Sequence, residues 1–576
     1  MKLSPHQPLA GILQPVTAIR TETDLGIGDL DGLRQMIDYC ARHHLNILQV
    51  LPINETSDDN SPYNAISAMA IEPSLLDIRP ESIPDLSPTK FKTIAKPTLL
   101  KSLRNGPVQY EKVKKLKRQL LEAAFDSFYK NTYGTGDSRD RDFAAFITEH
   151  TDWIYDYALF RLLMERHHGW PLWPTWPEEH QSPRRANAWL LTLHPKERHE
   201  ALRRLLYFIY VQWIAYRQWE AVKAYATSKN VFLMGDIPIG ISRYSADVWS
   251  DRSIFDLEWC GGAPPEKVFK ADPFTEKWGQ NWGIPLYRWD VLRQRNFDWW
   301  RLRVRNISRA FHIFRIDHVL GFYRFYSFPW TPDRNDFFLP LTEEEARAHT
   351  GGRLPHFKPY PDDTEEHKAA NRAQGEELLS MILDAAGETT VVAEDLGVVP
   401  DYVWPSLEKL GIPGFSIPSF LRTPDGHYAP PSTYRRLSVA APATHDLMPL
   451  ALAWQQAWKD IDSDNETDAT KARTEIQAIL HYAGLPHLAQ NPPRQYTDEI
   501  HFGYLRAILS SNAWMVITMI TDVFADTGRF NVPGKADPTN WTYRIPYPVS
   551  QLDNQPDLRR RMETYASLAA EYKRRL

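Results

Sequence analysis

The sequence predicts an α/β fold, a (β/α)8 TIM barrel with helical insertions and no C-terminal β domain. Two observations lead to this prediction. Eight short apolar runs, typical of strands buried on both faces, alternate with segments of helical periodicity. Three of the runs end in acidic residues, as expected where the carboxyl ends of barrel strands open to solvent. The runs span residues 12–16, 47–51, 231–234, 311–316, 389–393, 414–417, 437–443 and 514–520.

The segments between the runs define the expected organisation. A helical pattern at 31–43 follows the first run, and another at 371–386 precedes the fifth. Residues 84–225 are dominated by charged amphipathic helix, which we interpret as a mainly helical insertion between strands two and three. A shorter insertion is expected at 240–310. The whole chain, residues 1–576, then forms a single catalytic barrel.

Prolines weaken two of the eight strand signals. Pro413 and Pro418 bracket the sixth run, and Pro442 falls near the end of the seventh. A proline cannot donate a hydrogen bond to a neighbouring strand, so these two strands are expected to be the least regular.

Composition limits the classes of partner. The net charge of −5 gives no reason to expect nucleic acid or an anionic membrane surface. Cys40 and Cys260 allow at most one disulfide, which fits a reducing compartment. The first residues lack the apolar stretch of a signal peptide, and no run is long enough for a membrane span. We therefore expect a cytoplasmic protein; the sequence does not indicate its oligomeric state.

Acidic residues follow three of the predicted strands. Asp317 comes after the fourth, Glu394 and Asp395 after the fifth, and Asp446 after the seventh. Carboxylates on these strands of a barrel can converge on one pocket, which is the arrangement that cleavage of a glycosidic bond requires. One acid attacks the anomeric carbon while a second, protonated, gives its proton to the leaving oxygen. Alone, each such acid could equally form a structural ion pair.

Neighbouring residues indicate a role for each acid. Arg315 lies two residues before Asp317, on the same side of the strand, and can keep it ionised as a nucleophile must be. Glu394 follows three apolar residues, where desolvation would raise its pKa toward that of a working acid. His445 and Asp446 offer hydrogen bonds to sugar hydroxyls as an oxocarbenium-like centre forms.

Seven short motifs, taken in order, carry a family resemblance that runs from residue 11 to residue 544. Together they resemble the 4-alpha-glucanotransferases called amylomaltase or disproportionating enzyme. The motifs are SPYN at 61–64, GDIPI at 235–239, SADVW at 245–249, GQNWG at 279–283, RIDH at 315–318, AEDLG at 393–397 and THD at 444–446.

The resemblance implies the catalytic roles. Asp317 would be the nucleophile, Glu394 the general acid/base and Asp446 the transition-state stabiliser. Arg315 and His445 would bind the sugar at the cleavage point. The family needs no metal or organic cofactor, so none is expected here.

The resemblance also implies five supporting residues. Asp236 would support the site. Gln280 and Trp282, in the 240–310 insertion, match a loop that covers donor and acceptor near the scissile bond. Ser61 and Tyr63 match contacts on the acceptor side. For Trp282 the alternative is ordinary core packing, and for Tyr63 it is packing in the turn after Pro62.

The chain departs from the family pattern in places that leave the three acids intact. Val319 and Leu320 follow the RIDH motif where many members have Phe and Arg, and Leu447 follows Asp446 where Asn is common. The early loop, residues 54–60, is more acidic and contains less glycine than usual. Its adjacent acids at 58 and 59 are interpreted as a solvated loop rather than a cation site.

The implied activity is that of a retaining 4-alpha-glucanotransferase. It would move a segment of an alpha-1,4-glucan to the 4-hydroxyl of an acceptor glucan or glucose, through a covalent glycosyl-aspartate, with malto-oligosaccharides and alpha-glucans as substrates. Three alternatives stay open: a hydrolase with the same acids, a non-catalytic glycan-binding protein on the same barrel, and a phosphate-using glucan enzyme.

Overall fold

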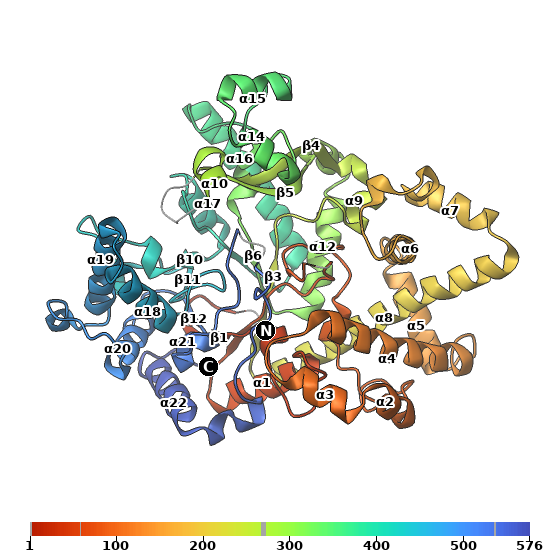
Figure 1. Cartoon of the computed structure of the whole chain (residues 1–576), viewed down its shortest axis with the longest axis horizontal. Coiled ribbons are helices and arrows are strands. Elements are labelled where there is room, and N and C mark those ends of the chain that lie inside the picture. The colour runs from red at the N-terminus through yellow and green to blue at the C-terminus, as the bar shows by residue number, and fades with distance from the viewer. Residues whose placement is uncertain (1–2, 58, 266–271, 535–536) are drawn as a thin grey trace.

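The computed structural model describes residues 3–57, 59–265, 272–534 and 537–576, so position 58 and part of the 240–310 range lie outside it. An eight-stranded parallel barrel ringed by helices occupies its centre (Figure 1). The barrel strands are, in chain order, β1 (Leu9–Leu13), β2 (Ile47–Gln49), β3 (Phe232–Ile237), β6 (Ile313–Ile316), β9 (Thr390–Ala393), β10 (Gly414–Ser416), β11 (Ser438–Ala440) and β12 (Met515–Met519).

The spatial order of the barrel strands is β10-β11-β12-β1-β2-β3-β6-β9. The backbone N–H of Ala393 donates to the Pro413 carbonyl (2.8 Å), which brings β9 against β10 at the remaining seam. The fold class predicted from the sequence is confirmed. Pro413 precedes β10 rather than interrupting it, so its missing N–H does not break that strand.

Strand boundaries differ from the predicted runs by up to three residues. β1 lies three residues earlier than the predicted 12–16, because Pro15 lacks an N–H and the chain turns into a short 3-10 helix, Val16–Ala18. β3 extends to Ile237, three residues further than predicted, which places Asp236 on the strand itself. At Gly11 a Cβ would come within 2.3 Å of the Ile47 carbonyl, so only glycine allows β1 and β2 to approach this closely.

Amphipathic helices cover the barrel. The side chain of Asp29 caps α1 (Leu30–Arg42) by accepting from the N–H groups of Asp31 and Gly32. α12 (Asp298–Ala310) packs on β3 and β6, and α16 (Glu365–Ala386) packs on β9. The others after β9 are α17 (Val403–Leu410), α18 (Leu450–Ile461), α19 (Glu466–Tyr482), α20 (Asp498–Leu509), α21 (Ile520–Phe524) and α22 (Pro556–Glu571). Among the described residues, no strand follows β12.

The segment between β2 and β3 is helical and lies to one side of the barrel (Figure 1). Its last helix, α8 (Pro195–Ser228), also packs on β3, α1 and α12, so it belongs to the barrel wall as well. The earlier helices are α2 (Pro88–Ile94), α3 (Pro97–Arg104), α4 (Tyr110–Asn131), α5 (Ser138–Glu149), α6 (Ile154–Arg166) and α7 (Pro183–Thr192).

A second, antiparallel sheet was not predicted. Its order is β5 (Gln280–Tyr287), β4 (Phe255–Ala263), β7 (Phe325–Phe328) and β8 (His356–Lys358). β4 and β5 contain glycines and a proline and pair with register shifts, so no period-two pattern marks them in the sequence. The short helices in the same stretch of chain are α9 (Ala246–Ser250), α10 (Pro273–Trp278), α11 (Trp289–Gln294), α13 (Leu320–Tyr323), α14 (Asn335–Phe338) and α15 (Glu343–Thr350).

The two ends of the chain meet at the amino ends of the strands. The indole N–H of Trp514, just before β12, donates to the Gln7 carbonyl (3.0 Å). The buried Arg574 guanidinium donates to the carbonyls of Leu509 (2.6 Å) and Ala513 (2.9 Å). In the described part of the chain, no helix has the length and apolar character needed to cross a bilayer.

A buried ion pair ties the loops after the first and last barrel strands. Arg544 donates to Asp24 Oδ2 (2.6 Å), and both side chains are fully buried. Asp24 also accepts from the backbone N–H groups of Thr21 and Gly26, each at 2.8 Å. The segment after β12 is therefore fixed across the carboxyl ends of the strands.

We predict that Asp24→Ala lowers the free energy of unfolding by about 3–5 kcal/mol, because it leaves Arg544 buried without its counter-ion. Asp462→Ala is the matched control. It removes an exposed pair with Arg494, and pairs of this kind contribute little to stability. Urea unfolding of the two variants measures the difference, and equal losses would contradict the prediction.

Candidate active site

Four acidic residues meet at the carboxyl ends of the barrel strands. Asp317 directly follows β6, Glu394 directly follows β9, and Asp446 lies in the loop between β11 and α18. Asp236, on β3, is in register with Arg315 on the adjacent β6. The strand order thus brings together residues that are up to 210 positions apart in the chain.

Arg315 holds two of these acids. Its Nη1 donates to Asp236 Oδ2 (2.5 Å) and its Nη2 donates to Asp317 Oδ1 (2.7 Å). Burial opposes the charge on Arg315, but Asp236 and Asp317 raise its pKa well above the ordinary value, so it stays protonated. The side chain of Asp317 is 28% exposed, whereas Asp236 is fully buried. Asp317 is therefore the carboxylate of the pair that a ligand can reach.

Burial also shifts the pKa values of Asp236 and His445. It raises the pKa of Asp236 to about 7, against the lowering effect of Arg315. It also lowers the pKa of His445, so that imidazole is neutral at pH 7.

Glu394 is positioned by the turn that follows Asp317. The backbone N–H of His318 donates to Glu394 Oε2 (2.7 Å), and that of Leu396 donates to Oε1 (3.1 Å). His318 adopts a left-handed backbone conformation (φ 49°), which is uncommon for a residue with a Cβ. Burial raises the pKa of Glu394 to about 8, outweighing the lowering effect of Arg315. Glu394 is thus a protonated acid at neutral pH.

Asp446 is fixed from the loop after β12. Asn531 Nδ2 donates to Asp446 Oδ1 (2.6 Å), and Arg529 Nη2 donates to its backbone carbonyl (2.9 Å). The other carboxylate oxygen lies 3.4 Å from His445 Nε2. Asn531 and Arg529 were not predicted from the sequence. The pattern that could have indicated them is a polar segment after the eighth predicted strand, at the same face of the barrel as the acids.

Tyr63 joins the early loop to the acids. Its hydroxyl donates to Asp236 Oδ2 (2.7 Å), and its ring stacks on His445 with centroids 5.2 Å apart. The Trp541 ring, which was also missed, lies 6.0 Å from both of these rings. Ser61 accepts from the Tyr63 backbone N–H (3.3 Å) and so shapes the turn before it. Tyr63 does more than pack in a turn.

Gln280 and Trp282 lie on β5 of the second sheet. The Trp282 indole N–H donates to Gln280 Oε1 (3.1 Å), and the ring meets His318 edge-on at 4.9 Å. Trp282 is 39% exposed, so it is not ordinary core. The second sheet therefore places an accessible aromatic ring over the turn that joins Asp317 to Glu394.

The unusual residues beside the acids serve packing. Val319 is fully buried, and its N–H donates to the Glu394 carbonyl (3.0 Å). Leu320 is 9% exposed and begins α13. Leu447 closes a turn by donating its N–H to the Thr444 carbonyl (3.0 Å) and packs against the main core.

The arrangement combines an accessible carboxylate, a neutral carboxylic acid and a third carboxylate held by an amide. Asp317 can act as a nucleophile, because Arg315 balances its charge. Glu394 can donate a proton and later take one back, since burial places its pKa near neutrality. A pair with these properties suits cleavage of a glycosidic bond.

Comparisons with known proteins agree over nearly the whole chain. A family model described as 4-alpha-glucanotransferase matches residues 14–550. A 4-alpha-glucanotransferase of Chlamydia caviae is 30% identical over 560 residues, covering 95% of this chain and 92% of that protein. One of Aquifex aeolicus is 28% identical over 557 residues, covering 93% and 95%.

Solved structures show the same fold. An amylomaltase from Streptococcus agalactiae in complex with acarbose superposes with a TM-score of 0.73 at 22% identity, covering 99% of this chain and 100% of that one. The amylomaltase from Corynebacterium glutamicum gives a TM-score of 0.75 at 19% identity, covering 98% of this chain and 75% of that one.

We predict that Glu394 titrates as a neutral acid in the folded protein. Its folded pKa of about 8 lies above its ordinary value, so raising the pH from 7 to 9 should remove a carboxylic-acid C=O band of Glu394 from the infrared difference spectrum. This loss comes in addition to those of Asp236 and Asp522, whose pKa values of about 7 make them titrate in every variant. Glu394→Gln should lack the Glu394 step, and Glu344→Gln, at an exposed site, should retain it. Persistence of the step in Glu394→Gln would show that another group carries it.

Proposed function

We propose, from the premise that this chain belongs to the 4-alpha-glucanotransferase family, that Asp317, Glu394 and Asp446 carry out its glycosyl transfer with retention of configuration. The chain is a glycosyl-transferring enzyme, and the family does not favour the hydrolase alternative. One observation supports the assignment of residues above the others. A single turn presents the nucleophile candidate and holds the acid candidate by the backbone N–H of His318.

In the first step, Asp317 attacks the anomeric carbon of the donor glucan. The glycosidic C–O bond breaks, and the Glu394 proton passes to the departing oxygen. Arg315 donates to Asp317 Oδ1 (2.7 Å), which balances the charge of the attacking carboxylate and fixes its position. The product is a glycosyl ester on Asp317 and an ionised Glu394.

In the second step, the 4-hydroxyl of an acceptor glucan or glucose attacks the same carbon. Ionised Glu394 takes the hydroxyl proton, the ester bond to Asp317 breaks, and both acids return to their starting states. A raised pKa suits Glu394 to both roles, because it gives up and regains a proton near neutral pH. No cofactor takes part in this scheme.

The residues around the acids are proposed to bind the sugar at the cleavage point. His445 and Asp446 would contact it from the loop between β11 and α18, and Arg315 and Asp236 would contact it from the ends of the barrel strands. Asp446 stabilises the oxocarbenium-like transition state, with Asn531 fixing one of its oxygens.

Accessible rings are proposed to contact neighbouring sugars. Trp282 with Gln280 covers the cleavage point, and Tyr63 with Ser61 contacts the acceptor. The apolar face of a sugar packs on such rings while its hydroxyls bond elsewhere. The acarbose complex of the S. agalactiae amylomaltase supports malto-oligosaccharides and alpha-glucans as the ligands.

The remaining sequence expectations stay proposals. We propose that 84–225 and 240–310 are insertions serving the single barrel, the second carrying the covering loop. We also propose a cytoplasmic setting, which two buried free thiols, Cys40 and Cys260, support.

Incubation of the pure protein with maltotriose in phosphate-free buffer tests the function. Transfer yields glucose together with chains longer than maltotriose, whereas products that are all shorter would indicate a hydrolase. Asp317→Asn should lose at least about 1,000-fold in turnover, because the covalent intermediate cannot form. The control Asp290→Asn, at an exposed site, should keep full turnover; full turnover in Asp317→Asn would refute the assigned nucleophile.

We predict that Asn531→Ala lowers kcat roughly 10- to 100-fold with little change in thermal stability, because Asp446 loses the donor that orients it. Asn131→Ala, at an exposed helix end, is the control. Initial rates of glucose release from maltotriose provide the measurement. An unchanged kcat would mean that Asn531 does not orient Asp446.

A further inference from the structure

The loop after β2 forms a hairpin that presents two proposed acceptor contacts at its tip. Residues 53–57 and 59–72, hereafter the early hairpin, pair through antiparallel bridges between Asn54 and Ile71 and between Thr56 and Ala65. Ser61 and Tyr63 lie at the closed end. The acidic residues that mark this loop in the sequence have no role in the mechanism above.

One of those acids points into the protein. The Glu55 side chain is only 6% exposed and lies against α6 of the helical segment. Its Oε2 accepts a short hydrogen bond from the Tyr157 hydroxyl, and its Oε1 pairs with Arg161 Nη2 (3.2 Å). Tyr157 and Arg161 are four residues apart, so they share one face of α6. The first strand of the early hairpin is therefore fixed by a buried charge pair.

The second strand of the early hairpin is fixed by α8. The fully buried Gln212 amide donates to the Ile71 carbonyl (2.9 Å) and accepts from the Ile71 N–H (2.8 Å). The same Nε2 lies 3.3 Å from the Tyr157 hydroxyl. Tyr157 thus connects the contacts of both strands. We call Glu55, Tyr157, Arg161 and Gln212 the anchor cluster.

A third helix reaches nearer the tip. Lys114 of α4 donates to Thr56 Oγ1 (3.0 Å) and to the Ser57 carbonyl (3.1 Å). Thr56 also donates its N–H to the buried Glu72 carboxylate (2.9 Å). Three helices of the segment between β2 and β3 therefore contact this one hairpin.

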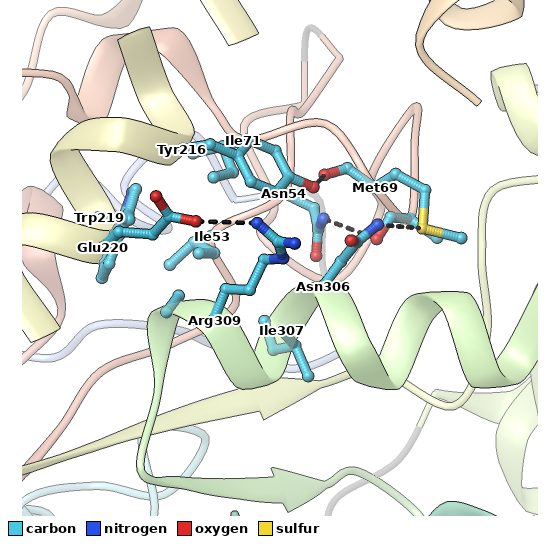
Figure 2. Close-up of a pocket in the computed structure, with 12 residues that line it drawn as sticks. Ile53, Asn54, Met69, Ile71, Tyr216, Trp219, Glu220, Asn306, Ile307 and Arg309 are labelled. Carbon is cyan, nitrogen blue, oxygen red and sulfur yellow. Dashed lines mark hydrogen bonds and ion pairs between the residues drawn. The ribbon is translucent and has the colours of Figure 1, made fainter. Parts of the chain in front are cut away.

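The base of the early hairpin packs in the main hydrophobic core, where Ile53, Met69 and Ile71 are at most 4% exposed. Figure 2 shows a pocket there, lined by Ile53, Asn54, Met69 and Ile71 of the hairpin and by residues of α8 and α12. The pocket holds about 350 Å³ of free space, partly open to solvent, and none of the three acids lines it. Apolar packing holds the base of the hairpin beside this pocket, and the polar contacts of the anchor cluster add directional constraints on its two strands.

We infer that the anchor cluster positions the acceptor-binding tip, and thereby sets how often an acceptor glucan rather than water takes the glycosyl group. The inference rests on the proposed function. Tyr63 donates to Asp236 at 2.7 Å and stacks on His445, so a small shift of the tip disturbs the surface an acceptor needs. Water needs no such surface. These four are positioning residues, since they lie beneath the tip and away from the acids.

Tyr157→Phe tests this, with Tyr155→Phe as the matched control. The first substitution keeps the ring and removes only the hydroxyl bonded to Glu55, whereas the Tyr155 hydroxyl faces Asn187 at an exposed site on the same helix. Two reactions are measured: aglycone release from an aryl maltotrioside without acceptor, and the product ladder from maltotriose with added glucose. We expect Tyr157→Phe to raise the glucose KM and the hydrolysed fraction at least about threefold, with aglycone release within about twofold of wild type.

Lys114→Met provides a second route, because it releases the hairpin near its tip without touching the anchor cluster. It should shift the same two quantities in the same direction, and thermal unfolding of every variant checks that each is folded. Should either folded variant match Tyr155→Phe, or lose aglycone release in parallel with transfer, the inference is wrong. A wild type that releases aglycone but forms no longer chains would overturn the proposed function itself.

Discussion

The site depends on one buried positive charge shared by two carboxylates. Arg315 lies between Asp236 on β3 and Asp317 after β6, and each is within hydrogen-bonding distance of its guanidinium. Arg315 supplies the counter-charge that two neighbouring carboxylates in a largely buried site need, because an uncompensated charge there is costly. The fork geometry of arginine also fixes both carboxylates relative to the barrel wall, which a lysine could not do. The adjacency of β3 and β6 is thus a chemical requirement as well as a topological one.

Sequence alone predicts the parts of this site that follow regular strands. Asp317, Glu394 and Asp446 could be found because apolar runs end just before or near them, and such ends share one face of a barrel. Asn531 and Trp541 were missed, since they lie in an irregular loop where no periodicity marks individual residues. The second sheet escaped prediction because the glycines of β4 and Pro285 of β5 hide its pattern. The sequence shows that the early hairpin is acidic, but only the structure shows that the Glu55 side chain is buried against α6.

The barrel, the second sheet and the helical segment each contribute different residues around the acids. The barrel supplies the reacting carboxylates, the second sheet brings Trp282 over them, and the helices beside the barrel hold the hairpin that carries Tyr63. The main hydrophobic core runs through these parts, and hydrogen bonds and ion pairs between them add contacts that depend on orientation more steeply than apolar packing does. Substrate preference in this chain is therefore expected to vary with residues far from the acids in sequence.

The joining of the chain ends at the amino ends of β1 and β12 has a practical consequence. Gln7 and Arg574 both bond to the chain around Trp514, at the opposite end of the strands from Asp317 and Glu394. An attachment point introduced next to Gln7 or Arg574 would therefore lie behind the barrel, away from the acids. Long glucans would keep their access to the carboxyl ends of the strands, so an attachment behind the barrel leaves the catalytic residues unobstructed.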